Sequence, residues 1–289
     1  MKVSFVGLGI MGKRMAANLL KQGIDLTVWN RSKEAEKELE AKGAKTASSL
    51  DKVVFESDVV FSMLSTPEVV KKIFFSKSGC LVSMKKNAIW VDCSTVNPSF
   101  SLQSAKEAKQ CEIRFLDAPV AGTKPQAENA ELIFFIGGDK NILSEIEYLL
   151  KYMGSKIMHS GDTGKGASYK MLVNMLLAQS MVIFSEAVLL GQKMGFSRDF
   201  LLDTLPHLAV SAPFTKAKAE MIRKQNYDVQ FPLELMHKDL RLVSQTASEL
   251  HQPLHMAALA REIYAQAEKE GLNRLDFSAI YKYLNEQDN

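Results

Sequence analysis

The sequence has few of the features that mark several large classes of protein. Only three of its 289 residues are cysteines, none of them spaced as CxxC, and an odd number cannot form a fully paired disulfide framework. We therefore expect a reducing, cytoplasmic setting. An excess of one charge is lacking too, because 36 Lys and Arg residues face 33 Asp and Glu residues. A net charge of +3 argues against a dedicated nucleic-acid-binding protein.

A clean apolar run long enough to cross a membrane is also missing. The longest apolar stretch lies within residues 171–190, and Asn174, Gln179 and Glu186 interrupt it. We interpret it as a buried helix and expect no membrane partner. The short apolar start of the chain is broken by glycine and followed at once by Lys13 and Arg14. That pattern argues against a signal peptide.

Metal-binding patterns are missing as well. The sequence contains no HExxH motif and no cysteine cluster, and no pair of carboxylates is spaced for acid–base work. His251 and His255 are close in sequence, but Pro253 between them argues against a single helical metal-binding face. We therefore predict no metal site.

What the chain does have is enough apolar material, 46% of its residues, for two buried cores. In residues 1–162, strand-like and helix-like segments alternate. The expected strands are 3–7, 25–29, 59–64, 88–92, 114–118, 132–137 and 156–159, and the expected helices are 10–22, 33–42, 67–75, 98–110 and 140–153. This alternation predicts parallel strands joined by helical crossovers, as in a Rossmann-type doubly wound α/β sheet.

The pattern changes after about residue 161, where helical periodicity takes over. The expected helices are 167–194, 198–205, 214–225, 233–250, 254–270 and 277–284, and we expect no strand there. The sequence thus predicts a Rossmann-type domain at residues 1–162 followed by an all-helical domain at residues 163–289.

A glycine-rich motif lies where the first strand meets the first helix. Gly7, Leu8, Gly9, Ile10, Met11 and Gly12 read GxGxxG. The first glycine permits a tight turn, the second lets the backbone approach a pyrophosphate, and the third allows close packing of helix and strand. Free N–H groups at the helix N-terminus favour phosphate. The motif predicts a dinucleotide cofactor.

The end of the second expected strand bears on which dinucleotide is bound. NAD-preferring domains place an Asp or Glu about 20 residues beyond the glycines, where it binds the ribose hydroxyls. Here Asn30, Arg31 and Ser32 occupy that place. Because a guanidinium pairs with a 2′-phosphate and an acid repels it, we predict NADP(H), with NAD(H) as the alternative. Arg31 as a plain solvated residue is the competing interpretation.

Together with motifs further along, the sequence resembles the β-hydroxyacid dehydrogenases over nearly its whole length. The family includes 3-hydroxyisobutyrate dehydrogenase, tartronate semialdehyde reductase and the glyoxylate/succinic-semialdehyde reductases. The matching segments, in the expected order, are Gly7–Gly12 with Met15-Ala16-Ala17-Asn18-Leu19, Asp92-Cys93-Ser94-Thr95, Asp117-Ala118-Pro119-Val120-Ala121-Gly122-Thr123, Gly164-Lys165-Gly166-Ala167-Ser168-Tyr169-Lys170 with Asn174, Phe231-Pro232-Leu233, and Lys238-Asp239-Leu240.

The resemblance implies a catalytic role for Lys170 as general acid/base. Asn174 follows four residues later, so both side chains project from the same helix face. In carbonyl reduction the nicotinamide supplies hydride, an ammonium supplies the proton, and a nearby amide orients the oxygen. The competing interpretation makes Lys170 a helix residue at the hinge between domains.

The resemblance also implies binding roles. Thr95 would contact the nicotinamide side of the cofactor, and the backbone of Met63 and Leu64 would pass its adenosine ribose and phosphates. From the helical domain, Phe231 and Lys238 would close over the cofactor. Turn capping at Ser94 and Thr95 and core packing of Phe231 are the structural alternatives.

Substrate binding would fall to Ser94, Ala121, Gly122 and Thr123 with Lys170 and Asn174. Backbone N–H groups and a small hydroxyl suit a carboxylate. Many relatives have Ser where this chain has Ala121, so one hydroxyl is lost. Thr123-Lys124-Pro125 favours the glyoxylate/succinic-semialdehyde reductase subgroup.

The sequence therefore predicts an NADP(H)-dependent enzyme that reduces a small carboxylate-bearing aldehyde in the cleft between the domains. The alternative enzymes are 3-hydroxyisobutyrate dehydrogenase and tartronate semialdehyde reductase. A non-catalytic dinucleotide-binding scaffold is the alternative of another class, and the presence of both Lys170 and Asn174 argues against it. The resemblance implies a homodimer or homotetramer, formed through the helical domain.

Overall fold

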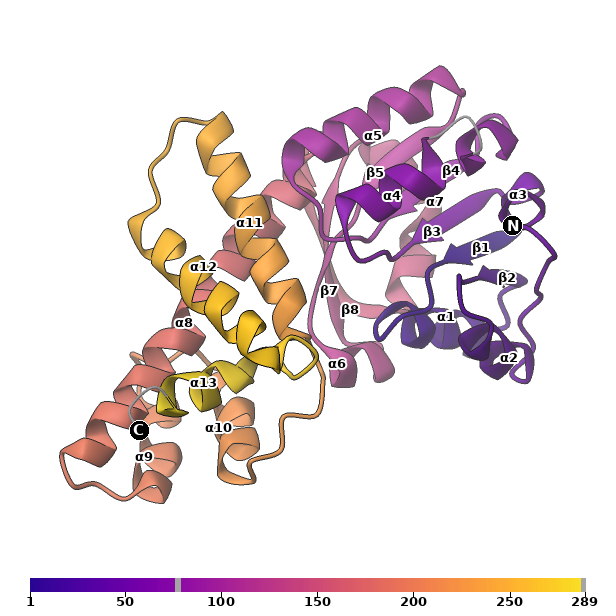
Figure 1. Cartoon of the computed structure of the whole chain (residues 1–289). Coiled ribbons are helices and arrows are strands. Elements are labelled where there is room, and N and C mark those ends of the chain that lie inside the picture. The colour runs from indigo at the N-terminus through magenta and orange to yellow at the C-terminus, as the bar shows by residue number, and fades with distance from the viewer. Residues whose placement is uncertain (76–78, 287–289) are drawn as a thin grey trace. The chain divides into compact units, whose positions relative to one another are not determined.

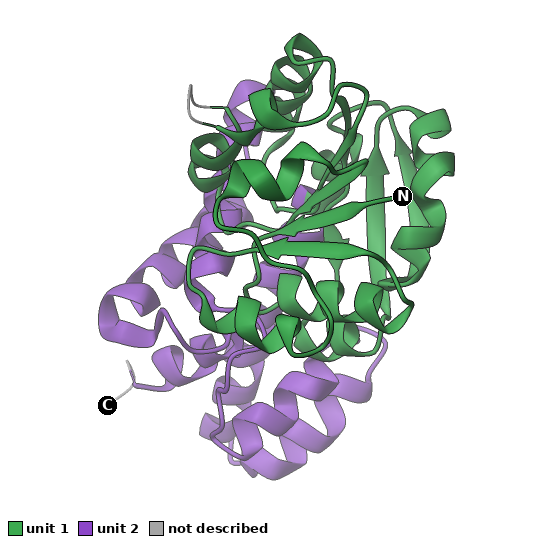
Figure 2. Ribbon diagram, turned by 90° about the vertical axis from the view of Figure 1, so that its right-hand side faces the viewer, with its two compact units in different colours: residues 1–170 green, residues 171–289 purple. Residues whose placement is uncertain are grey.

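The computed structural model describes residues 1–75 and 79–286. The chain forms two compact units, Met1–Lys170 and Met171–Asn289 (Figure 2). Residues 287–289 of the predicted helical domain lie outside the described residues. Hydrophobic clusters are found in each unit, so each has a core of its own.

Unit 1 is built on an eight-stranded sheet (Figure 1). Its strands are β1 (Val3–Val6), β2 (Leu26–Trp29), β3 (Val59–Ser62), β4 (Ile89–Asp92), β5 (Arg114–Asp117), β6 (Val120–Ala121), β7 (Leu132–Gly137) and β8 (Gly154–Gly161). The order is β2-β1-β3-β4-β5-β7-β6, and β8 pairs with β7. Strands β1 to β5 are parallel, which confirms the Rossmann-type prediction for this part.

The prediction of parallel strands throughout is wrong at β7. This strand runs antiparallel to β5, with Asp117 opposite Gly137, and antiparallel to β6, while β8 joins it in parallel. The reason lies in the connection from β5 to β7. A parallel crossover needs a dozen or more residues, usually in a helix, but helix α6 here covers only Lys124–Glu128. Because β5 and β6 both run antiparallel to β7, the chain reverses direction after β6, in the connection that contains α6.

Helices cover both faces of this sheet, as Figure 1 shows. One core contains residues of β1 and β3 with residues of α1 (Gly12–Lys21), α2 (Glu34–Glu40), α6 and α7 (Lys140–Lys151). The other contains residues of α3 (Leu50–Phe55), α4 (Pro67–Phe74) and α5 (Pro98–Gln110). There Trp90 stacks on Phe74, with ring centroids 4.2 Å apart. Because both faces are covered, the strands are nearly continuous apolar runs.

The predictions omitted several short elements of unit 1. These are α3, α6, β6 and the 3-10 turn η1 (Cys80–Ser83). Segments of two to six residues are too short to show a hydrophobic period. Capping signals were nevertheless present: the Ser49 hydroxyl accepts from the Lys52 N–H at the start of α3, and Thr123 begins α6.

Unit 2 is helical, as predicted. Helix α8 (Lys165–Lys193) begins in unit 1, and it is followed by α9 (Arg198–Thr204), η2 (Leu205–His207), α10 (Thr215–Arg223), α11 (Leu233–Glu249), α12 (His255–Ala267), η3 (Glu268–Leu272), η4 (Phe277–Ala279) and α13 (Ile280–Glu286). The expected helix 254–270 ends earlier, in a π turn containing Gly271 at φ 82°. Within the described part of this unit, the β contact is an isolated bridge between Pro232 and Asp276.

Helix α8 is less buried than predicted. Leu172, Leu176, Ile183 and Leu190 are 54–63% exposed. The helix carries its own apolar side chains on every side, and the rest of the chain packs against only some of them. By length and composition, α8 alone among the described helices could cross a membrane, but core helices of soluble proteins meet the same criteria.

Candidate functional site

The glycine-rich turn has the geometry that a phosphate group needs. Gly7 adopts φ 96°, and a Cβ there would lie 2.4 Å from the Met63 carbonyl oxygen. A Cβ on Gly12 would lie 2.0 Å from the Gly7 oxygen, whereas a Cβ on Gly9 would meet no atom within 4 Å. Helix α1 begins without a side-chain cap, and the N–H groups of Lys13 and Arg14 donate to the Gly9 and Met11 carbonyl oxygens, so an anion would meet the N–H groups that precede them in the turn. The turn therefore fits the pyrophosphate of a dinucleotide.

Sheet register brings several of the expected cofactor-binding residues to one edge. Val6 lies opposite Ser62, and Ser62 lies opposite Asp92. The residues that follow these strands therefore share the carboxyl edge, where ligands bind in doubly wound sheets. Gly7, Met63, Leu64, Ser94 and Thr95 all lie there.

Two of these residues are tied to one another. The Ser94 hydroxyl accepts from the Leu64 N–H at 2.9 Å, and Ser94 itself is 1% exposed. Its hydroxyl therefore joins the ends of β3 and β4, a structural use that the sequence interpretation missed. Thr95, the next residue, is partly exposed at the same edge.

Beneath this edge lies Asp92, which is fully buried. It accepts hydrogen bonds from the Ser62 hydroxyl at 2.7 Å and the Ser94 N–H at 3.1 Å. Burial raises the pKa of Asp92 to about 6, although these two serine partners act in the opposite direction. The nearby charge of Asp117 raises the pKa further. Asp92 is thus a buried acid with a pKa well above that of an ordinary aspartate.

The Asn30 side chain links the end of β2 to the glycine-rich turn. Its Oδ1 accepts from the Leu8 N–H at 2.9 Å, and its Nδ2 donates to the Ser32 carbonyl and hydroxyl oxygens. The Asn30 N–H donates to the buried carboxylate of Glu36 at 2.7 Å. Glu36 is paired with Lys33. Arg31 and Ser32 are exposed beside this network.

The segment expected to hold the substrate carboxylate has an internal partner. Gly122 is exposed at φ 116°. The N–H and the hydroxyl of Thr123 both point to Oε1 of Gln126, at 2.9 and 3.0 Å. These bonds belong to the capping box of α6. The donors of Thr123 are therefore engaged within the chain, a use that the sequence interpretation did not foresee.

Lys170 is the sixth residue of α8 and is 7% exposed. The first turn of this helix is fixed by Asp117, whose two carboxylate oxygens accept from the N–H groups of Gly164 and Ala167 at 2.7 and 2.8 Å. Asp117 lies within a motif that the sequence singled out, but spacing gave no sign of this contact. The separation in sequence is too long for any local pattern to reveal.

In unit 2, Asn174 is joined to two of the expected motif residues. Its Nδ2 donates to Oδ2 of Asp239 at 2.5 Å, and Asp239 Oδ1 lies 2.7 Å from the Lys238 ammonium. Asn174 is 1% exposed, and its Oδ1 has no hydrogen-bond partner among residues 1–75 and 79–286. Since the amide N–H₂ faces Asp239, the side-chain atom of Asn174 that is left without a partner among these residues is an acceptor. The sequence predicted an orienting amide without deciding this polarity.

Phe231 lies on the segment before α11. Its N–H donates to Oδ2 of Asp276 at 3.1 Å, and its ring packs against Phe277 at 5.7 Å. Asp276 is fully buried and forms an ion pair with Lys218 at 2.8 Å. The sequence interpretation missed this buried pair because Lys218 lies on α10 and Asp276 precedes η4, far apart in sequence.

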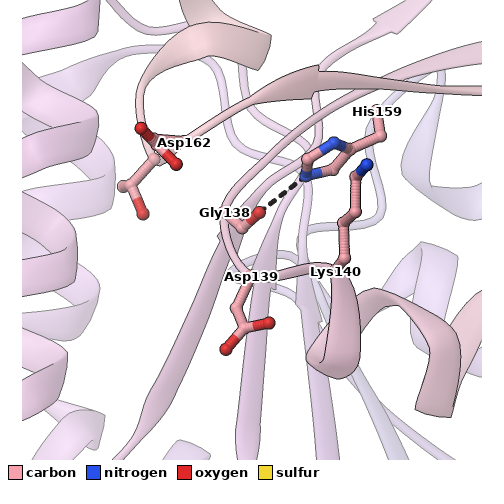
Figure 3. A pocket seen from close by; sticks show the side chains of 6 residues that line it. Gly138, Asp139, Lys140, His159 and Asp162 are labelled. Atoms are coloured by element: carbon pink, nitrogen blue, oxygen red, sulfur yellow. Dashed lines mark hydrogen bonds between the residues drawn. The ribbon is translucent and has the colours of Figure 1, made fainter.

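Unit 1 also has an open pocket. It is lined by Gly138, Asp139, Lys140, His159, Asp162 and Thr163, and Figure 3 shows the His159 ring bonded to the Gly138 carbonyl oxygen. None of the expected site residues lines it. Among the described residues, no three His, Cys, Asp or Glu side chains gather as metal ligands. The absence of a metal in the working protein stays a prediction.

Two known families together match nearly the whole chain. Residues 2–161 match the NAD binding domain of 6-phosphogluconate dehydrogenase. Residues 164–284 match the family described as NAD-binding of NADP-dependent 3-hydroxyisobutyrate dehydrogenase. Both descriptions agree with a nicotinamide dinucleotide as the cofactor.

Individual relatives match over similar lengths. Glyoxylate/succinic semialdehyde reductase 1 of Arabidopsis thaliana is 37% identical, over 97% of this chain and 97% of its own. The chloroplastic reductase 2 of the same plant is also 37% identical, over 98% of this chain and 79% of its own. A solved structure of 3-hydroxyisobutyrate dehydrogenase from Mycobacterium tuberculosis, with L-serine, is 28% identical and superposes with a TM-score of 0.87, covering 98% of each chain.

Proposed function

This chain belongs to the β-hydroxyacid dehydrogenase family of NAD(P)-dependent enzymes acting on CH–OH donors, and we propose that it reduces small carboxylate-bearing aldehydes of the glyoxylate and succinic semialdehyde type with NADP(H). The observation that carries the proposal is the pair Lys170 and Asn174. They stand one turn apart on α8, and Asp239 fixes the second of them. The two plant relatives add support, since their names give the same substrates.

The preference for NADP(H) is argued from the residues after β2. The bound dinucleotide supplies hydride from its nicotinamide ring. Arg31 and Ser32 are exposed, so the Arg31 guanidinium can approach a 2′-phosphate from the protein surface while the Ser32 hydroxyl accepts from Asn30 Nδ2. Two acids follow closely in sequence: Glu34 is exposed at the start of α2, whereas Glu36 is buried and paired with Lys33, so Glu36 repels that phosphate less than an exposed carboxylate does.

The proton in our proposal comes from Lys170. Its ammonium donates to the carbonyl oxygen as hydride reaches the carbonyl carbon, and it recovers the proton from water afterwards. Asn174 Oδ1 is an acceptor, so it can bind the Lys170 ammonium or the hydroxyl group of the product. It repels the carbonyl oxygen of the substrate, which has no proton to donate. This polarity favours one orientation of the reacting C–O group.

For the substrate carboxylate we propose the backbone at Ala121 and Gly122 as the seat. Exposed Gly122 allows an anion to approach its N–H without steric hindrance. Thr123 joins this seat only by exchanging its bonds with Gln126. Ser94 contributes indirectly, by holding Leu64 in place. Phe231 and Lys238 are proposed to close over the cofactor.

We further propose that residues 163–289 form the substrate and dimerisation domain of a cytoplasmic homo-oligomer. The apolar residues Leu172, Leu176, Ile183 and Leu190 recur every four to seven residues on one exposed side of α8. Such a stripe is typical of a surface covered by a second helix. A second copy of the chain is the proposed partner.

The test of the proposed function is a substrate panel. The purified full chain is mixed with NADPH, and absorbance is followed with glyoxylate, succinic semialdehyde, tartronate semialdehyde and methylmalonate semialdehyde. We expect turnover on the first two substrates. Faster turnover on either of the others would favour the alternative dehydrogenases, and NADPH binding without turnover on any would favour a scaffold.

A further inference from the structure

Asp117 joins the sheet of unit 1 to the helix that carries Lys170. It is the last residue of β5 and is 1% exposed. One carboxylate oxygen accepts from the Gly164 N–H at 2.7 Å, and the other accepts from the Ala167 N–H at 2.8 Å. Lys170 follows Ala167 by less than one helical turn. Asp117 thus holds the N-terminal end of α8 against the end of β5.

Two glycines make the contact close. A Cβ on Gly166 would lie 2.3 Å from the Phe135 carbonyl oxygen and 2.9 Å from the Asp117 carbonyl oxygen. A Cβ on Gly137 would lie 2.4 Å from Oδ1 of Asp117. The first turn of α8 therefore rests directly on the backbone of β5 and β7, and no side chain can be added without moving it.

The electrostatics suit a rigid joint. A carboxylate is favoured at the N-terminus of a helix, where the N–H groups carry partial positive charge. Burial raises the pKa of Asp117, while its bonds to the Gly164 and Ala167 N–H groups lower it. Both oxygens bind, so the carboxylate fixes the helix in translation and in rotation.

We propose that Asp117 is a positioning residue for Lys170, holding the first turn of α8 so that the ammonium reaches the substrate oxygen in one orientation. The inference rests on the role of Lys170 in the proposed function. A rigid helix transmits a shift of its first turn to a residue one turn further on. A misplacement of about 1 Å at a reacting group can cost about 100-fold in rate.

The experiment uses five variants of the full chain, one of which is Lys170→Ala alone. Asp117→Asn keeps one acceptor but turns an N–H₂ group toward the other N–H donor. Gly137→Ala displaces the Asp117 carboxylate without changing it, and it serves if Asp117→Asn folds poorly. The matched control is Asp139→Asn, because Asp139 also caps a helix of unit 1, accepting from the Asn141 N–H at 2.7 Å on α7. The double variant, Asp117→Asn with Lys170→Ala, tests whether Asp117 acts through the lysine.

Three readouts are compared: kcat with NADPH and the best aldehyde of the panel, KM for NADPH, and hydrogen exchange of the Gly164 and Ala167 amides. We expect Asp117→Asn and Gly137→Ala to lower kcat by about 10- to 100-fold, with KM for NADPH unchanged and the two amides exchanging faster. The Asp139→Asn control should match the parent. On the Lys170→Ala background, Asp117→Asn should cause no further loss.

Several results would overturn the inference. One is an unchanged kcat in Asp117→Asn while Lys170→Ala is inactive. Another is a loss of equal size with and without Lys170, which a merely structural role produces. Unchanged amide exchange would contradict the contact itself. Failure of the proposed function gives a different result, because Lys170→Ala would then keep its turnover while the two amides still exchange faster in Asp117→Asn.

Discussion

The side-chain amide of Asn174 on α8 donates to the carboxylate of Asp239 on α11, with 2.5 Å between Nδ2 and Oδ2. Both residues are 1% exposed. If this buried amide rotated by half a turn, its carbonyl oxygen would face the carboxylate of Asp239, and the two acceptors would repel each other. The bond therefore leaves Oδ1, an acceptor, as the unpartnered side-chain atom of Asn174 among the described residues.

Removing the carboxylate in Asp239→Ala should cost both stability and turnover. An unpaired buried donor destabilises a protein by about 1–3 kcal/mol, and the freed amide loses its defined polarity. We expect the urea midpoint to fall and kcat to fall with it. Gln245→Ala, an exposed change on the same helix, is the control and should alter neither. A native kcat in Asp239→Ala would contradict the orienting role.

The buried pair of Lys218 and Asp276 gives an asymmetric prediction for stability. Removing one member of such a pair typically costs about 3–5 kcal/mol. Without Lys218, Asp276 keeps its bonds to the N–H groups of Gln230, Phe231 and Ser278 and to the Ser278 hydroxyl. Lys218 without Asp276 keeps only a weak contact with Gln230 Oε1 at 3.4 Å, one with the Met221 sulfur, and the Phe277 ring. Urea unfolding should therefore show a larger loss for Asp276→Ala than for Lys218→Met, and the reverse order would refute the argument.

Arg31→Ala tests the choice of cofactor. Hydrogen bonds to charged groups contribute about 1.5–3 kcal/mol, and each 1.4 kcal/mol corresponds to about tenfold in affinity. We expect KM for NADPH to rise by about tenfold or more and KM for NADH to change little. Lys109→Ala, another exposed cation of unit 1, serves as the control. Equal changes for both cofactors would argue against contact between Arg31 and a 2′-phosphate.

Asp92 should give the protein a pH-dependent stability. Burial raises its pKa from 3.8 to about 6, so between about pH 4 and 6 the folded state holds a proton that the unfolded state has lost. This group's contribution is therefore lost as pH rises through that window. The shift corresponds to about 3 kcal/mol. Asp92→Asn lacks this term, so its stability relative to the parent should improve from pH 4 to pH 6. A difference that stays constant with pH would contradict the raised pKa.

Much of the fold was predictable because its signals are local or periodic. The glycine motif at residues 7–12 marks where the first helix begins, and prolines mark the starts of α4 and α5. The bounds of α5 and β7 equal the predicted ranges. The reversal at β7 was missed because it depends on a connection whose helix has only five residues. The exposed side of α8 was missed because its sequence is apolar on all sides. Such a sequence does not show which side chains the rest of the chain buries.

The site divides in the same way. Residues in contiguous motifs, such as Lys170 and Asn174, could be named from the sequence, although their roles remain proposals. The residues that hold them could not. Asp117 meets Gly164 and Asp239 meets Asn174 across long stretches of sequence, and only the folded chain brings them together. The internal engagement of Thr123 by Gln126 was visible as a capping-box pattern but was passed over in favour of a binding role.

The central claim is that Lys170 delivers the proton, and one measurement tests it most directly: turnover of Lys170→Ala beside its affinity for NADPH. General acid catalysis contributes about 100- to 10,000-fold. We predict a loss of kcat of at least about 100-fold, with the dissociation constant for NADPH, measured by fluorescence titration, close to that of the parent. A variant that binds NADPH and turns over glyoxylate at a near-native rate would contradict the account.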